Sequence, residues 1–286
     1  PPNSPFQEDD WREICREDLN LSIGALVELA KEGVWPSVRW REAFQAWSTD
    51  ELALSSWQKI ASYINEIPDE VLCDLTQNIS QWLEVVSTSL DCHEDIFIKL
   101  CQHVLALPDK NDMDNEDIFF HALNHPIGHV TKALLHLWFK REPNDGDELP
   151  EVFSSIFSQL CDTSVERFRL GRAILASQAI ALFRVDPSWT EAKLLPLFDW
   201  TSDPAEAQAA WEGFLSSPRL YRPLLVAFKE QFLADKSRLV ETVARKTRPL
   251  ASQIFRDFIL SYSPADLTGH IQRTHLQKTL GQFKKT

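Results

Sequence analysis

Apolar residues recur at helical spacing along most of this chain, and that pattern limits its fold more than any other feature. Three successive stretches place apolar residues at i, i+3, i+4 and i+7, the spacing of one helix face. Glycine is scarce, with 8 in 286 residues, and no segment sustains the alternation of a half-buried strand. The sequence therefore predicts an all-α fold. The stretches are Ala53/Trp57/Ile60/Ala61/Ile64/Ile67, Leu72/Leu75/Ile79/Trp82/Leu83/Val86 and Phe97/Leu100/Cys101/Val104/Leu107.

Small polar residues, often followed by proline, mark many predicted helix starts. A side-chain oxygen at the N-cap accepts a backbone N–H that has no partner in the helix, and proline is tolerated next because it lacks that N–H. An acid three residues after the cap completes a capping-box spacing, as Glu206 does after Asp203. The predicted caps with proline are Asp186-Pro187, Asp203-Pro204, Ser217-Pro218 and Ser263-Pro264, and those with the acid alone are Ser48/Glu51, Asp91/Glu94 and Thr163/Glu166.

The segments between these caps read as about 14 to 16 helices joined by short links. Such an arrangement is typical of helical hairpins stacked side by side, so we expect an irregular HEAT-like α-solenoid, although no fixed repeat period recurs. Two longer polar links lie at residues 108–115 and 142–150. We place a boundary in the first, which gives an N-terminal helical subdomain, 1–108, and a C-terminal helical-repeat subdomain, 115–286. One continuous superhelix is the alternative.

Residues 164–183 mix small side chains with large apolar ones. Because small residues let neighbouring helices approach closely, this composition predicts a helix that is buried on more than one side. A helical hairpin is predicted next, with apolar residues from Ala207 to Leu215 on its first arm and a break at 216–218.

The cysteines and the apolar runs narrow the class of protein. The 5 cysteines are scattered and form no C-x-x-C pair, which argues against a disulfide framework and a zinc ribbon and favours a reducing cytoplasm. No apolar run approaches the roughly 18 to 20 residues that span a bilayer, so we expect a soluble chain without a membrane partner. The start, Pro-Pro-Asn-Ser-Pro, lacks methionine, which suggests a fragment of a longer polypeptide.

Charge is distributed unevenly along the chain. Residues 219–286 hold 13 Lys and Arg against 5 Asp and Glu, a net +8, while residues 1–218 hold 16 against 37, a net −21. Arg245, Lys246 and Arg248 lie in the basic part, and an acidic surface, including that of another subunit, is their expected partner. Weak contact with nucleic acid is the alternative, since few aromatic residues accompany these cations. A second cationic group comprises Arg167, Arg169, Arg172 and Arg184.

Histidines cluster between His121 and His136 and raise the question of a metal site. His121, His125 and His129 are four residues apart, a spacing at which imidazoles on one helix can share a metal. Pro126 argues against one continuous helix, because proline opens helices more readily than it continues them. We therefore predict His125 at an N-cap and no metal or cofactor, with a metal-dependent enzyme that uses this region as the alternative.

The helix after Pro126 is predicted to carry a basic strip. His129, Lys132, His136 and Lys140 share one polar stripe, opposite an apolar one. A cationic strip repels a metal ion, so we predict that His125, His129, Lys132 and His136 bind a protein partner. The helix itself is expected to pack between two neighbours.

Sequence motifs for enzymatic chemistry are missing. The chain has no phosphate-binding G-x-x-x-x-G-K-[ST] loop, no G-x-G-x-x-G and no G-x-S-x-G. Cys101 lies on the apolar stripe of its segment, and His103 lies on another side, which predicts a core thiol beside a surface imidazole. We predict no catalytic residue and no enzyme activity for this fragment.

Two motifs carry a family resemblance. His125-Pro126-Ile127-Gly128, continuing to Trp138, and Ala209-Ala210-Trp211-Glu212-Gly213-Phe214-Leu215 resemble a helical domain of unknown function at the C-terminus of bacterial SIR2-like antiviral defence proteins. The resemblance covers residues 115–250. It implies a parent protein whose N-terminal domain degrades NAD on phage infection, and a helical module that senses the trigger or holds the oligomer. The implied partners are its own subunits, other domains of the parent chain or a phage protein.

Overall fold

The computed structural model describes residues 10–108, 117–216 and 221–227. Within these ranges it contains fourteen α-helices and no strand, which confirms the all-α prediction. Contacts between Cα atoms divide the chain into two compact units, 1–143 and 144–286. The predicted boundary at 108–115 falls mostly outside the described residues and stays a prediction. The division by contacts comes later, at the start of the second polar link.

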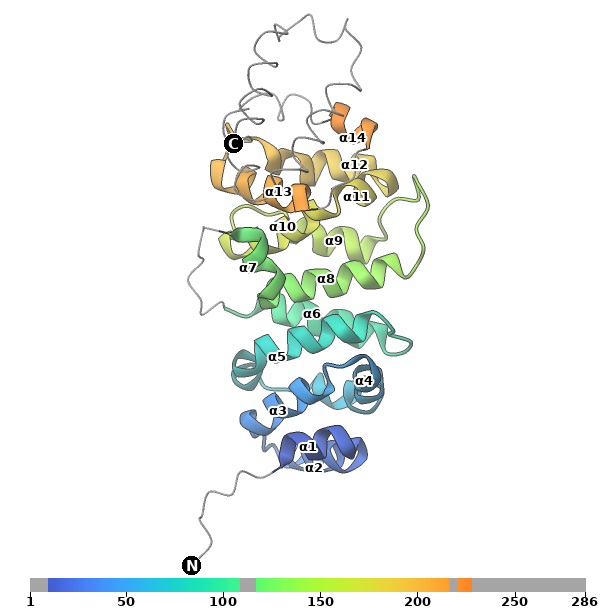
Figure 1. Cartoon of the computed structure of the whole chain (residues 1–286), viewed down its shortest axis with the longest axis vertical. Helices are drawn as coiled ribbons and strands as arrows, with labels where there is room; N and C mark the ends of the chain where they lie inside the picture. The colour runs from blue at the N-terminus through green and yellow to red at the C-terminus, as the bar shows by residue number, and fades with distance from the viewer. Residues whose placement is uncertain (1–9, 109–116, 217–220, 228–286) are drawn as a thin grey trace, which may run out of the picture. The chain divides into compact units, whose positions relative to one another are not determined.

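The described residues of the first unit form eight helices, α1 to α8 (Figure 1). Helix α3 lies between α1 and α5, and α5 lies between α3 and α8, whereas α4 contacts both α2 and α6. Helix α8 also contacts α6 and α7, so it packs between neighbours as predicted. The helices are α1 (Trp11–Glu17), α2 (Leu19–Lys31), α3 (Ser37–Trp47), α4 (Asp50–Ile64), α5 (Asp69–Ser87), α6 (Glu94–Ala106), α7 (Ile118–Asn124) and α8 (Pro126–Phe139).

A chain of aromatic rings joins four helices of this unit. Phe44 of α3 lies 5.0 Å from Trp82 of α5, which lies 5.7 Å from Trp57 of α4, which in turn lies 5.4 Å from Phe97 of α6, measured between ring centroids. All four side chains are fully buried. The three predicted apolar stripes thus become the inward faces of α4, α5 and α6, because helical spacing brings each stripe to one side.

The second unit is built around α10, which contacts α9, α11 and α13. Residues 164–183 are not one helix: the chain breaks at Gln178, between α10 and α11. The predicted burial of this segment is confirmed for α10, in which every residue from Arg169 to Ala176 is buried. Its elements are α9 (Glu151–Leu160), η1 (Glu166–Phe168), α10 (Arg169–Ser177), α11 (Ala179–Val185), α12 (Pro187–Trp189), η2 (Thr190–Leu194), η3 (Leu195–Phe198), α13 (Pro204–Ser216) and α14 (Arg222–Ala227).

Helices α10 and α13 approach closely at a glycine. A Cβ atom added to Gly213 would lie 2.0 Å from the carbonyl oxygen of Ala173. Only glycine fits there without moving backbone, so the glycine of the second resemblance motif sets the distance between the two helices.

The caps with proline are predicted better than the caps with an acid alone. Asp186 accepts the Trp189 N–H at 2.9 Å, and Asp203 accepts the Ala205 N–H at 2.9 Å. The three capping boxes without proline are wrong, because the residues at those N-caps are Thr49, His93 and Val165. The pairs Ser217-Pro218 and Ser263-Pro264 lie outside the described residues.

Candidate functional site

The motif His125-Pro126-Ile127-Gly128 makes the corner between α7 and α8. His125 is the N-cap of α8, as predicted, and its Nδ1 accepts the Ile127 N–H at 3.2 Å. A Cβ atom on Gly128 would lie only 1.6 Å from the carbonyl oxygen of Ala122 in α7. The motif therefore serves a local backbone geometry that lets α8 begin directly against the end of α7.

The basic strip of α8 faces α5. The Glu84 carboxylate of α5 accepts a hydrogen bond from His129 Nδ1, and it forms an ion pair with Lys132 Nζ at 2.7 Å. One turn further along α5, the hydroxyl oxygen of Ser87 lies 3.1 Å from His136 Nδ1. We call the group Glu84, Ser87, His129, Lys132 and His136 the α5–α8 seam.

The seam continues past the end of α5, where the Lys140 ammonium donates to the Leu90 carbonyl. The five seam residues are buried or half-buried, whereas Lys140 is exposed. The strip therefore faces a neighbouring helix rather than solvent. Partner binding through His125, His129, Lys132 and His136 stays a prediction, and it would require the seam to open.

Gln77 lies against the other ring nitrogen of His129. The Gln77 amide nitrogen donates to the Asn124 carbonyl at 3.0 Å and lies 3.4 Å from His129 Nε2. His129 is therefore held between Glu84 and Gln77, both of them on α5.

Burial and nearby partners have opposite effects on the pKa of Glu84, and they also have opposite effects on the pKa of His136. Burial alone would raise the pKa of Glu84, but hydrogen bonds from His129 and Lys132 outweigh it and hold that pKa below its ordinary value. Burial lowers the pKa of His136, and the nearby Glu84 carboxylate offsets this only in part. At neutral pH the Glu84 carboxylate is therefore ionised and the His136 imidazole is neutral.

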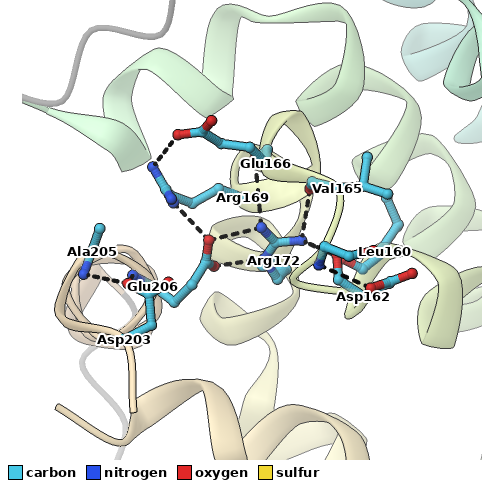
Figure 2. A network of polar contacts seen from close by, with 10 residues as sticks. Leu160, Asp162, Val165, Glu166, Arg169, Arg172, Asp203, Ala205 and Glu206 are labelled. Carbon is cyan, nitrogen blue, oxygen red and sulfur yellow. Dashed lines mark hydrogen bonds and ion pairs between the residues drawn. The ribbon is translucent and has the colours of Figure 1, made fainter. Parts of the chain in front are cut away.

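A second polar network joins α10 to α13 (Figure 2). Glu206, which is 3% exposed, accepts from Arg169 Nε at 2.7 Å and from Arg172 Nε at 2.6 Å. Arg172 Nη2 adds a third bond to the same carboxylate at 2.8 Å. The carboxylate expected to complete a capping box therefore binds two arginines instead.

Arg172 also satisfies carbonyl groups at the C-terminal end of α9 and in the loop that follows it. Its Nη1 donates to the carbonyl oxygens of Leu160 at 3.1 Å, Asp162 at 2.8 Å and Val165 at 3.2 Å, as Figure 2 shows. The last carbonyls of a helix lack partners within it, and a guanidinium can satisfy several at once. Arg169 and Arg172 thus work inside the unit rather than as a cationic surface.

The remaining predicted residues lie at separate places. Cys101 is fully buried, and burial raises the pKa of its thiol, whereas His103 Nε2 pairs with Asp69 at 2.8 Å near the surface, so the predicted core thiol and surface imidazole are confirmed. All five cysteines are free thiols. Arg245, Lys246 and Arg248 lie outside the described residues.

The Glu206 network could have been suspected from the sequence, whereas the α5–α8 seam could not. Arg169 and Arg172 stand three residues apart in an otherwise small and apolar helix, and Glu206 precedes a largely apolar run. Charges in such settings usually pair with each other. Glu84 gave no such signal, because the residues three and four positions away from it on α5 are polar.

Within the described ranges, no three His, Cys, Asp or Glu side chains come together as a metal-binding group. Nor, in the same part of the chain, does any helix combine the length and the apolar character needed to cross a bilayer. Comparisons with family models, with curated proteins and with solved structures return no match.

Proposed function

We propose that this chain is a non-catalytic helical scaffold that binds other protein chains, as the sensor or oligomerisation module of a larger protein. The observation that carries the proposal is the use of its ionisable side chains. The seam residues hold α5 against α8, Glu206 of α13 binds two arginines of α10, and one of these, Arg172, also binds the end of α9. Ion pairs and hydrogen bonds of this kind fix neighbouring helices to one another, and a fixed set of helices can present a binding surface.

The order of helices in the first unit supports a solenoid-like framework. Alternate helices are neighbours: α1, α3 and α5 follow one another, and α4 contacts both α2 and α6. Stacked helical hairpins give this pattern, and their extended faces commonly bind proteins. We propose on this basis that the described helices of the first unit form an irregular HEAT-like array.

The proposed biological setting is bacterial anti-phage defence in the cytoplasm. It rests on the resemblance of residues 115–250 to the helical module of SIR2-like defence proteins. The glycines of both motifs, Gly128 and Gly213, have well-defined packing roles, so the motifs are explained by helix packing as well as by a shared family. Within that setting the partners are other copies of the chain, other domains of its parent or a phage protein.

Co-purification of two differently tagged forms of the chain, and of the chain with the remainder of its parent polypeptide, tests the proposal. We expect a stoichiometric protein partner and unchanged NAD in the presence of the purified chain. Failure of every such pair to co-purify contradicts the proposal.

Two further results would favour the alternatives. A stoichiometric metal that is lost in the His125→Ala/His129→Ala variant would indicate a metal-dependent enzyme. Affinity for DNA or RNA that survives a rising salt series would indicate a nucleic-acid-binding protein, since simple phosphate contacts weaken steeply with salt.

A further inference from the structure

Helix α2 exposes an apolar stripe on the side away from its neighbours. Leu21 is 58% exposed and Leu29 is 38% exposed, and Ala25 lies between them at helical spacing. A Cβ atom added to Gly24 would meet nothing within 4 Å, so open space lies over this side of the helix. Ile23, Leu26 and Val27 face the core instead.

The end of α2 extends the stripe. Gly33 has a φ of +75°, and its N–H donates to the Ala30 carbonyl at 2.9 Å, while the Val34 N–H donates to the Leu29 carbonyl at 2.9 Å. These bonds form a Schellman ending, in which the residue at the Val34 position commonly packs on the one at the Leu29 position. Val34 is 49% exposed. We call Leu21, Ala25, Leu29 and Val34 the α2 face.

Acidic side chains border the α2 face. Asp18, Glu28 and Glu32 are exposed on the same helix and at its ends. Lys31 is paired with Glu28 at 2.7 Å, and its ammonium lies 5.9 Å from the centre of the Tyr63 ring. A partner that fits this surface must combine apolar side chains with an excess of positive charge.

The chain itself contains a segment of that kind. Residues 228–286 hold 11 Lys and Arg against 5 Asp and Glu, a net +6. Apolar residues recur every fourth position at Leu250, Ile254 and Phe258, directly after the basic cluster that includes Arg245 and Arg248. Apolar residues at this spacing can line one face of a helix and so match an apolar stripe on another helix.

We infer that the α2 face binds the basic segment 228–286 of a second copy of this chain. The inference rests on the proposed interaction role and names the partner. Pairing of two α2 faces would bring Glu28 and Glu32 against like charges, whereas the basic segment neutralises them. The contact is head-to-tail, because each copy offers one acidic apolar face and one basic segment.

Concentration distinguishes binding to a second copy from binding within the same chain. Fold-back onto the same chain would give a monomer at every concentration, whereas binding to a second copy gives oligomers whose proportion rises with concentration.

Light scattering of the full chain across a salt and concentration series tests the inference. We expect oligomers at low salt that dissociate as salt rises, because added ions screen the exposed charges. Leu21→Asp and Leu29→Asp should each weaken association about tenfold or more, which is about 1.4 kcal/mol, because each places a charge in an apolar contact. Phe120→Asp is the matched control: Phe120 is 64% exposed but lies on α7, so association should not change.

Charge reversal makes the test specific to this pair of surfaces. Glu28→Lys/Glu32→Lys and Arg245→Glu/Lys246→Glu/Arg248→Glu should each be monomeric alone. A mixture of the two variants should associate again, because the reversed face of one then matches the reversed segment of the other. Circular dichroism confirms that every variant is folded.

A monomeric wild-type chain at low salt, or a mixture that stays monomeric, overturns the inference. So does an equal loss of association in Phe120→Asp. If the chain is monomeric but still co-purifies with another protein, the inference fails and the proposed function stands.

Discussion

Glu206 and Glu166 bind the same arginine in very different surroundings. Glu206 is 3% exposed, whereas Glu166, which lies 3.4 Å from Arg169, is 72% exposed. Loss of a buried charge leaves its partners without compensation, while an exposed pair contributes little. We expect Glu206→Gln to lower the free energy of unfolding by about 3 kcal/mol or more, as measured by urea denaturation followed by circular dichroism.

Glu166→Gln is the matched control and should change the free energy of unfolding by less than about 0.5 kcal/mol. Similar values for the two variants would show that the Glu206 network does not hold α10 against α13.

Three glycines allow a second comparison at the residue scale. Gly128 and Gly213 are pressed against backbone oxygens of neighbouring helices, whereas Gly24 faces open space. Alanine at Gly128 or Gly213 must displace backbone and should cost about 1 to 3 kcal/mol or more. Alanine at Gly24 should instead stabilise by about 0.5 to 1 kcal/mol, because it restricts the unfolded chain and favours the helix.

Thermal and urea unfolding of the three alanine variants check this prediction. A stabilised Gly128→Ala or Gly213→Ala variant would contradict the close helix approach that the structure shows.

At the scale of elements, the α5–α8 seam makes the first unit sensitive to pH. The pKa of His136 is lowered from 6.5 in the folded chain, chiefly by burial. As pH falls below 6.5, the unfolded chain gains a proton that the folded chain resists, so stability decreases by up to about 1.4 kcal/mol per pH unit. Near its folded pKa the loss levels off. We expect His136→Asn to flatten the decrease between pH 7 and pH 5, as measured by urea denaturation.

Glu84 affects the stability of the fold in a second, lower range of pH. Its folded pKa is also lowered, through its bonds to His129 and Lys132, so its stabilising contribution is present above 4.5 and is lost as pH falls through the folded value. Glu84→Gln should therefore leave the slope between pH 7 and pH 5 almost unchanged. An unaltered slope in His136→Asn would show that the seam imidazole does not couple folding to pH.

Local sequence predicts elements well when one short stretch contains the whole cause. The apolar stripe of α4 and the N-cap at His125 are examples, since helical period and proline chemistry act within a few residues. One acid-only capping box fails because a tertiary partner competes: Asp91 accepts a hydrogen bond from the Gln58 side chain at 2.9 Å. Another fails locally, because the Ser48 hydroxyl donates to the Phe44 carbonyl of the preceding helix. The contact between the basic strip and Glu84 could not be predicted from local sequence, because Glu84 lies 45 residues from His129.

At the scale of the whole molecule, the sequence marks the polar links but does not tell which of them divides the chain into units. The link at 108–115 is polar and long enough to suggest a boundary, yet α8, which follows it, packs on α5 and α6. Polar composition predicts exposure of a link, but it does not report which helices meet across it. That information lies in side chains such as His129, which reach back to an earlier helix.

Truncation decides which division describes the folding unit. A chain of residues 1–143 keeps the aromatic core and the α5–α8 seam, so it should be helical and unfold cooperatively in urea. A chain of residues 1–108 lacks α7 and α8 and therefore exposes the face of α5 that carries Glu84, together with the apolar residues beneath it. We expect it to be less stable by several kcal/mol or to aggregate, since α8 alone contributes Ile127, Val130, Leu134 and Trp138 to the core at roughly 1.5 to 3 kcal/mol each. Equal stability of the two fragments would place the boundary at 108–115 instead, and would make α7 and α8 an attachment to a framework that is complete without them.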